Sequence, residues 1–335
     1  MTTTTLSPQP NPHAIDTLLQ SQTIAMIGYG NQGAAQAQNL RDGGYTVTVA
    51  VPENGPSWGR AQADGFSVCT VAEAAQTADV LVMAFPDTQH GITYHRDMAP
   101  NLRPPNDRPQ TLLFVHGFSI VYTEIVPPPH VDVVLVSPKG IGSQVRAQFV
   151  AGSGVAALVG VHQNSTGHAE ALAHAYAMAL GCHRIAIIAA TFAQETMTNL
   201  FSEQVVLCGG VTHLIQTAFD TLTERGYPKD IAYFVCLHEL KLITDMIFTH
   251  GITGMRQRIS DTARYGDLTV GPSVIGEPTR QAMRDALDAI ESGAFAQRWM
   301  AEYGQGQPQA KALFEASKGH AIDAVGQKLR AAFLT

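Results

Sequence analysis

The sequence has few cysteines, few charged residues and no long apolar run, and each scarcity excludes a class of protein. Four cysteines among 335 residues stand far apart without a C-x-x-C pair: Cys69, Cys182, Cys208 and Cys236. This spacing argues against a disulfide framework and a cysteine metal site, and it fits reduced thiols in a cytoplasmic protein. No segment approaches the apolar length that a membrane span needs, so we expect no membrane partner.

Positive charge is also scarce, with 21 lysines and arginines against 28 aspartates and glutamates. The net charge of −7 and the lack of a basic cluster predict no nucleic-acid partner. Residues 1–13 contain neither a basic region nor an apolar core, so we expect a frayed tail and not a signal peptide. The hydrophobic content of 45% and the chain length are enough for two globular domains.

The stretch 23–51 predicts a strand, a glycine turn, a helix and a second strand in direct succession. Apolar residues 24–27 precede a G-x-G-x-x-G spacing, a helix is expected over about 34–41, and β-rich residues follow at 45–51. The first glycine permits a tight turn, the second lets a pyrophosphate approach the backbone, and the third lets the helix pack closely. We therefore expect this turn to bind a dinucleotide through Gly28, Tyr29, Gly30, Asn31, Gln32 and Gly33.

The loop at 52–58 follows the second strand, where such folds contact the adenosine ribose. Glu53 stands where a carboxylate could accept the ribose hydroxyls, and the loop itself contains no lysine or arginine before Arg60. This composition favours NADH over NADPH. The alternative stays open, because Ser57 and Arg60 could hold a 2′-phosphate while Glu53 is merely solvated.

Three further predicted strands end in polar residues. The runs 79–85, 111–115 and 131–137 lead into Pro86-Asp87, His116 and Lys139 respectively. Open α/β sheets bind ligands outside the carboxyl ends of their strands, so we expect all of these residues at the ligand-binding edge. The alternatives are a surface role for Lys139 and a packed core position for His116.

Helical patterns replace the alternating strands and helices from residue 191 onward, which predicts a domain boundary at 189/190. The segments 193–207 and 231–248 carry apolar residues at helical spacing. On each, two positions four residues apart share a face: Asn199 with Glu203, and Val235 with Glu239.

These segments together resemble one family. The chain is similar to the short form of ketol-acid reductoisomerase, the acetohydroxyacid isomeroreductase, in GYGNQG, HGF, SPKGIGSQVR, ALVGVHQNSTGHA, ETMTNLFSEQVVLCGG, AYFVCLHELKLITDMIF, RISDTARYGD and, more weakly, GAFAQRWM. The resemblance implies a Rossmann domain with a parallel sheet over 1–189 and a knotted all-helical domain over 190–335. It also implies that two helical domains interlock into a homodimer or higher oligomer, with the active site between domains and partly between subunits.

The family holds two Mg²⁺ ions with four carboxylates on two helices, and the resemblance carries only two of these over. Glu203 and Glu239 match family ligands, whereas Asn199 and Val235 stand at the positions of the other two, and Met197 replaces another common acidic residue. We expect at most one weakly held Mg²⁺. The alternative for both glutamates is that of ordinary solvated side chains.

Other family positions are kept. Lys139 matches the lysine that approaches the substrate, His116 the histidine of HGF, and Ser260 the serine that binds the substrate carboxylate. Ser260 could instead be only a helix cap. Ile141 and Ser143 replace a common proline and histidine.

Three functions are compatible with this pattern. The favoured hypothesis is an NAD(P)H-dependent reductase acting on the carbonyl or imine of a small carboxylate without alkyl migration, with Lys139, His116, Glu203 and Glu239 as the catalytic candidates. The second is a functional isomeroreductase that converts 2-acetolactate to 2,3-dihydroxy-3-methylbutanoate. The third is a non-catalytic, cofactor-binding paralogue.

Overall fold

The computed structural model describes residues 17–333, and the chain divides into two compact units that meet between Thr196 and Met197. Each unit is described by itself. The expected N-terminal tail at 1–13 lies outside the described residues.

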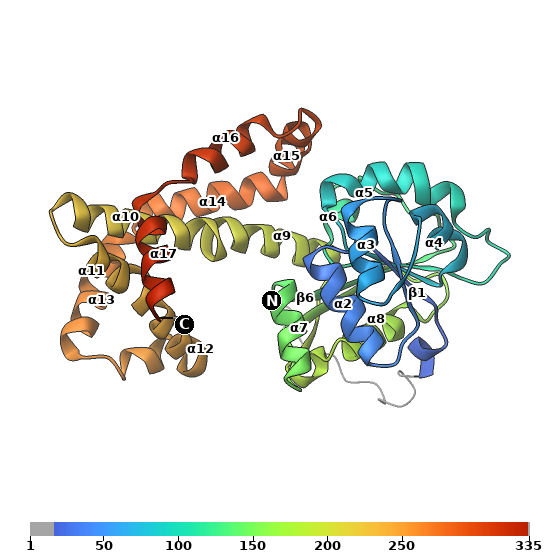
Figure 1. Cartoon of the computed structure of the whole chain (residues 1–335), viewed down its shortest axis with the longest axis horizontal. Helices are drawn as coiled ribbons and strands as arrows, with labels where there is room; N and C mark the ends of the chain where they lie inside the picture. The colour runs from blue at the N-terminus through green and yellow to red at the C-terminus, as the bar shows by residue number, and fades with distance from the viewer. Residues whose placement is uncertain (1–16, 334–335) are drawn as a thin grey trace. The chain divides into compact units, whose positions relative to one another are not determined.

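An eight-stranded sheet forms the centre of the N-terminal unit (Figure 1). Its spatial order is β3-β2-β1-β4-β5-β6-β7-β8, and every pairing is parallel except that of β6 with β7. This parallel-dominated sheet confirms the predicted Rossmann domain, but β7 runs antiparallel to β6, which the expectation of a parallel sheet did not include. The strands are β1 (Ile24–Ile27), β2 (Val47–Ala50), β3 (Ser67–Cys69), β4 (Val80–Met83), β5 (Thr111–Phe114), β6 (Asp132–Pro138), β7 (Ala157–Gln163) and β8 (Ile187–Ala189).

The central strands consist of short apolar runs because helices cover both faces of the sheet. All residues of β1, β4, β5 and β6 are buried. The helical elements of this unit are α2 (Asn31–Asp42), α3 (Pro56–Ala63), α4 (Val71–Thr77), α5 (Asp87–Thr93), η1 (Tyr94–Met98), η2 (Ala99–Asn101), α6 (Phe118–Val121), α7 (Gly142–Val150), α8 (Ala169–Ala179) and η3 (Cys182–Arg184).

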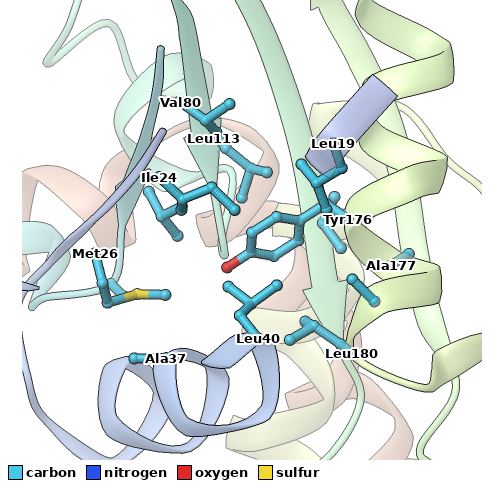
Figure 2. Packing of buried hydrophobic residues seen from close by; sticks show 14 of the residues in the cluster. Leu19, Ile24, Met26, Ala37, Leu40, Val80, Leu113, Tyr176, Ala177 and Leu180 are labelled. Atoms are coloured by element: carbon cyan, nitrogen blue, oxygen red, sulfur yellow. The ribbon is translucent and has the colours of Figure 1, made fainter. Parts of the chain in front are cut away.

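Two apolar cores result, one on each face of the sheet. Helices α2 and α8 pack with β1 and β4 around Leu40 and Tyr176, as Figure 2 shows. On the opposite face, α4, η1 and α6 contribute residues such as Ala75, Tyr94 and Ile120. These cores hold the carboxyl ends of the strands in fixed register, and this edge carries the loops of the candidate site.

The helix α9 (Phe192–Ser202) begins in the N-terminal unit and continues into the C-terminal one. Phe192 belongs to a sheet core, and Glu195 and Thr196 are completely buried. The first turn of α9 therefore packs as part of the sheet domain. The sequence-based boundary at 189/190 had assigned the whole helix to the second domain.

The described part of the C-terminal unit is helical, which confirms the predicted second domain (Figure 1). The expected knot stays a prediction. After α9 come η4 (Glu203–Leu207), α10 (Gly209–Glu224), α11 (Lys229–Tyr233), η5 (Phe234–His238), α12 (Glu239–Arg256), α13 (Asp261–Val274), α14 (Glu277–Glu291), α15 (Ala294–Gly304), α16 (Pro308–Ser317) and α17 (Ala321–Phe333).

One continuous helical stretch, 192–224, is long and apolar enough to cross a membrane by length and composition alone. The expectation that no segment approaches this length is wrong by that criterion. A core helix of a soluble protein passes the same test, so this single stretch is a weak indication of a membrane span.

Candidate functional site

A cavity of about 480 Å³ opens at the carboxyl edge of the sheet. Nine predicted cofactor residues line it: Gly28, Tyr29, Gly30, Asn31, Gln32, Ser57, Pro86, Asp87 and His116. The other lining residues are the mostly apolar strand ends Val51, Pro52, Met83, Ala84, Phe85 and Val115, which sequence reasoning did not single out. Each of these residues adjoins a predicted site residue or lies at the end of a predicted strand, so their position in the sequence could have identified them.

The glycine turn has the geometry that a pyrophosphate needs. Gly28 has a φ of 94°, and a Cβ there would lie 2.7 Å from the carbonyl oxygen of Ala84. A Cβ at Gly33 would lie 2.3 Å from the oxygen of Gly28, so only glycine lets α2 approach the strand this closely. A Cβ at Gly30 would meet nothing within 4 Å. The backbone at Gly30 is thus open to a ligand at the N-terminus of α2, and the residues fit a dinucleotide.

The ribose loop contains a tight turn, and Glu53 lies outside the cavity lining. Gly55 donates to the carbonyl of Pro52, and Asn54 has a φ of 60°. Pro52 and Ser57 line the cavity, whereas Glu53 is exposed and is not among the lining residues. The role of Glu53 on the ribose stays a prediction.

Arg60 lies over the ring of Tyr29, with 5.3 Å between its guanidinium carbon and the ring centroid. The Tyr29 hydroxyl donates to Asp64 at 2.7 Å. Burial and the neighbouring Asp64 raise the pKa of Tyr29 to about 12, so the hydroxyl stays protonated. Arg60 lines an adjacent depression that shares Gly30 and Asn31 with the cavity. The alternative of a phosphate held by Arg60 therefore has a structural counterpart.

A buried histidine supports the cavity wall at 85–87. His90 is 1% exposed, its Nε2 lies 2.9 Å from the carbonyl oxygen of Phe85, and its Nδ1 lies 2.8 Å from Ser119 Oγ. Burial lowers the pKa of His90 to about 4, so the ring is neutral, donates from Nε2 and accepts at Nδ1. His90 thereby ties the loop after β4 to the start of α6.

The chemical groups of the N-terminal unit converge on Glu195. One carboxylate oxygen, Oε1, lies 2.7 Å from Lys139 Nζ and 2.9 Å from Ser137 Oγ. The other, Oε2, lies 2.8 Å from His116 Nδ1 and 3.1 Å from the backbone nitrogen of Gly117. Four donors therefore surround this carboxylate, and Nε2 is the His116 nitrogen that can serve a ligand in the cavity.

The balance of charges in this cluster decides its protonation. Burial opposes ionisation of Glu195, but the hydrogen bond and charge of His116 and the Lys139 ammonium outweigh it and lower the pKa of Glu195 to about 2. Burial likewise opposes the charge on His116, yet the hydrogen bond and charge of Glu195 raise its pKa above the ordinary value of 6.5. The cluster thus pairs one buried, ionised carboxylate with the Lys139 ammonium and with a histidine whose pKa is raised.

Sequence reasoning predicted Lys139 and His116 but missed Glu195 and Ser137, which join them. A signal for Glu195 existed: Phe192, Glu195, Thr196 and Leu200 are buried on one face of α9, with spacings of three, four and eight residues from the first. A carboxylate on the apolar face of a helix needs cationic partners, and both candidates were already identified. The Lys139 side chain is 31% exposed, so it is the more exposed partner of the buried Glu195 carboxylate.

In the C-terminal unit, the first pair of predicted metal positions forms a direct hydrogen bond. Asn199 Nδ2 donates to Glu203 Oε1 at 2.9 Å. Glu203 starts the π-helical turn η4, and Gly209 and Gly210 follow, where a Cβ would lie 2.1 Å and 2.0 Å from backbone oxygens of that turn. The amide thus occupies a carboxylate oxygen that a cation would need.

The second pair also lies at a π-helical turn. Val235 is 45% exposed within η5, and Glu239 follows directly as the first residue of α12. The valine side chain offers no ligand atom. Among residues 17–333, no three histidine, cysteine, aspartate or glutamate side chains cluster as a metal site would require. An amide and an apolar side chain thus stand at the two positions where the family resemblance implies carboxylate ligands of a two-Mg²⁺ centre.

Ser260 is the N-cap of α13, where its Oγ accepts from the backbone nitrogen of Ala263 at 3.2 Å. The capping role considered from sequence is therefore present. Binding of a substrate carboxylate by Ser260 stays a prediction.

Comparison with known proteins covers both units. A family model described as "Acetohydroxy acid isomeroreductase, NADPH-binding domain" matches residues 18–186, and "Ketol-acid reductoisomerase, C-terminal domain" matches residues 192–334. An NADH-preferring ketol-acid reductoisomerase from an uncultured archaeon is 40% identical, with a TM-score of 0.91 over 96% of this chain and 97% of that one.

More distant structures share the fold alone. A semialdehyde dehydrogenase NAD-binding protein from Cupriavidus necator is 19% identical, with a TM-score of 0.63 over 81% of this chain and 99% of that one. A pyrroline carboxylate reductase from Plasmodium falciparum is 14% identical, with a TM-score of 0.52 over 83% of this chain and 98% of that one.

A Rossmann domain with an open glycine turn, joined to a helical domain, defines the protein as an NAD(P)H-dependent oxidoreductase. The family models and the identity of 40% make the assignment narrower. The chain belongs to the ketol-acid reductoisomerase family.

Proposed function

We propose that this protein reduces the carbonyl or imine of a small carboxylate with NADH and that it does not catalyse alkyl migration. The observation that carries the proposal is a contrast within the chain. The dinucleotide cavity and the Lys139–Glu195–His116 cluster are complete, whereas the metal positions hold an amide and a valine. Reduction needs the first set of groups, and migration needs the second.

The bound nicotinamide supplies the hydride, and the side chains of the chain manage the proton. Lys139 Nζ donates to Glu195 and to Ser137 Oγ, which fixes the ammonium at the carboxyl edge of the sheet. An ammonium held there stabilises the negative charge that develops on a carbonyl oxygen and can protonate it directly or through a water. His116 also lines the cavity, and its Nδ1–H donates a hydrogen bond to the ionised Glu195 carboxylate.

NADH is the proposed physiological cofactor. No lysine or arginine belongs to the cavity lining, in which Asp87 and His116 are the ionisable side chains apart from the buried Tyr29. A 2′-phosphate would therefore meet no lysine or arginine in the lining of this cavity. The 40% identical relative is an NADH-preferring enzyme, which supports the same choice.

Ser260 is proposed to bind the substrate carboxylate, while Glu203 and Glu239 are proposed to hold at most one weakly bound Mg²⁺. We also propose a cytoplasmic enzyme that acts as a homodimer or larger homo-oligomer. The 40% identical structural relative is a ketol-acid reductoisomerase, and the C-terminal family model covers the helical unit.

The test offers 2-oxo acids and cyclic imine acids to the full chain with NADH. Lys139→Gln should lower kcat about 100-fold with little change in the Kd for NADH, because the proton donor is lost and the cofactor cavity is not. Lys311→Gln, an exposed position on α16, is the control and should match the wild type. Full activity of Lys139→Gln would overturn the assigned role, and NADH binding without turnover of any such acid would favour the non-catalytic alternative.

A further inference from the structure

A chain of three hydrogen bonds runs from the core of the sheet domain to the turn that carries Lys139. The Tyr176 hydroxyl on α8 donates to Gln36 Oε1 at 2.9 Å, and Gln36 Nε2 donates to Gln32 Oε1 at 3.1 Å. Gln32 Nε2 then donates to the carbonyl oxygen of Gly140 at 2.8 Å. Both Tyr176 and Gln36 are 0% exposed, and Figure 2 shows the tyrosine ring among apolar side chains.

The direction of every bond in this chain follows from its last acceptor. A backbone carbonyl oxygen only accepts, so Gln32 must present its amino group to Gly140 and its oxygen to Gln36. Gln36 must then present its own amino group to Gln32 and its oxygen to Tyr176. The tyrosine must donate, and burial raises the pKa of Tyr176 well above its ordinary value, which keeps the hydroxyl protonated.

These three hydrogen bonds connect the glycine turn with the turn that follows Lys139, and the proposed reduction requires both turns to lie side by side. Gln32 belongs to the glycine turn and lines the dinucleotide cavity, and Gly140 directly follows Lys139. The two loops also touch through their backbones, because a Cβ at Gly142 would lie 2.0 Å from the carbonyl oxygen of Asn31. Because the two backbones are in contact, the hydrogen bond from Gln32 to Gly140 fixes the position of the Lys139 turn relative to the glycine turn.

Further bonds between α2 and α7 extend this connection away from the site. Arg146 on α7 donates to Asn39 Oδ1 at 2.9 Å and to Asp42 Oδ2 at 2.5 Å, and Asn39 Nδ2 donates to the carbonyl of Val145 at 3.3 Å. These bonds hold the helix bodies together. The bond from Gln32 to Gly140 acts at the end of α2 where the chemistry lies.

We propose that Tyr176 and Gln36 are positioning residues for the reaction: they fix the orientation of the Gln32 amide and thereby hold the Lys139 turn against the dinucleotide turn. Neither residue lines the cavity. The consequence for catalysis rests on the proposed reductase function, whereas the consequence for the Lys139 turn does not.

The test compares Tyr176→Phe with Tyr94→Phe in the full chain. Both rings are buried, but Tyr94 belongs to the core on the opposite face of the sheet. In Tyr176→Phe, Gln36 Oε1 has no donor, so the orientations of the Gln36 and Gln32 amides are no longer fixed by the tyrosine hydroxyl. Tyr176→Phe should speed hydrogen–deuterium exchange at the amides of 139–145 about tenfold, and Tyr94→Phe should leave it unchanged.

A second variant, Gln36→Glu, keeps the shape and reverses one bond. A carboxylate at this position accepts from Tyr176 but cannot donate to Gln32, so the Gln32 amide must turn and lose Gly140. The same increase in exchange at 139–145 is expected. Equal exchange at 139–145 in Tyr176→Phe and Tyr94→Phe would overturn the proposal, whether or not Gln36→Glu folds.

Turnover provides a separate readout. If the reductase function is correct, Tyr176→Phe should lower kcat about fivefold while the Kd for NADH, from fluorescence titration, changes less than twofold. Equal loss of cofactor affinity and kcat would indicate general disruption and would count against positioning. Exchange and NADH titration need no turnover, so a failure of the reductase function would show in the activity assay alone.

Discussion

At the scale of single residues, Glu195 determines the electrostatics of the site. Its carboxylate is 0% exposed and accepts from four donors, among them Lys139 and His116. A buried carboxylate stays ionised only where hydrogen bonds and neighbouring positive charge offset the cost of its burial. The sequence displayed all three residues, but only the packing of the first turn of α9 on the sheet brings them together.

Neutralising Glu195 should destabilise the protein. Glu195→Gln leaves Lys139 and His116 without their counter-charge, and we expect the free energy of unfolding to fall by about 2 kcal/mol or more. Denaturant unfolding at pH 6 measures this change. Glu170→Gln, an exposed position in the first turn of α8, should fall within about 0.5 kcal/mol of the wild type.

The difference in the free energy of unfolding between the wild type and Glu195→Gln should depend on pH. Because the pKa of Glu195 is lowered from 4.5 to about 2, its stabilisation is present above pH 4.5 and is lost as the pH falls toward 2. Because the pKa of His116 is raised above 6.5, its stabilisation is present below pH 6.5 and is lost as the pH rises through the raised value.

The stability difference between the wild type and Glu195→Gln should therefore be largest between pH 4.5 and 6.5 and should narrow on both sides. Unfolding curves from pH 2 to 9 provide the measurement. A difference that stays constant across this range would show that the ion pairs do not stabilise the fold.

At the scale of elements, the buried strands and the glycine turn could be predicted because local pattern determines them. The runs at 24–27, 80–83 and 112–114 are continuous apolar segments in the sequence and lie in strands of the structure. The edge strand β3 has three residues, and β7 ends in polar residues, so neither carries a strong periodic signal. The antiparallel direction of β7 depends on pairing with β6, which no local pattern encodes.

The part of the candidate site that lies on the glycine turn and at strand ends could be predicted from the sequence, and the rest could not. Cavity residues on the glycine turn and at strand ends follow from the topology of such sheets. The π-helical turns η4 and η5 were not predictable, because apolar spacing alone gave continuous helices across 193–207 and 231–248. Glu195 was missed because the domain boundary was placed before its helix.

The loop at 52–58 should determine cofactor preference. We expect NADH to bind at least as tightly as NADPH, and Pro52→Arg should shift the ratio of the two Kd values toward NADPH by about tenfold by placing a cation at the cavity wall. Fluorescence titration with both cofactors gives the ratio.

Arg60→Ala separates the two explanations of that preference. If Arg60 is only stacked on Tyr29, the variant should keep the wild-type ratio of Kd values. A selective loss of NADPH affinity in this variant would show that Arg60 holds the 2′-phosphate. Clearly tighter binding of NADPH than of NADH by the wild type would contradict the preference for NADH.

At the scale of the whole molecule, the helical unit has much apolar surface and a small core. Its described core cluster centres on Phe219, Ala232, Tyr233, Ile322 and Leu329. Large apolar side chains are exposed along its helices, including Leu207, Leu242, Phe248, Tyr265, Leu268 and Val270. An apolar surface of this extent is typical of an interface between subunits.

We therefore expect at least a dimer at micromolar concentration. Sedimentation equilibrium measures this, and Phe248→Glu, at a side chain that is 93% exposed, should weaken the assembly by about tenfold or more. Val126→Glu, at a 73% exposed position in the N-terminal unit, is the matched control and should leave the assembly unchanged. A stable wild-type monomer would contradict the expectation.

We propose that this member of the ketol-acid reductoisomerase family has kept reduction and lost migration. The most direct measurement offers two substrates separately with NADH and Mg²⁺: 2-acetolactate, which requires migration, and 3-hydroxy-3-methyl-2-oxobutanoate, in which migration has already occurred. We predict turnover of the second and a rate at least about 100-fold lower for the first, because migration needs two Lewis acids at once. Asn199→Asp combined with Val235→Glu should create activity on 2-acetolactate. Comparable rates for the two substrates with the wild-type chain would contradict the account.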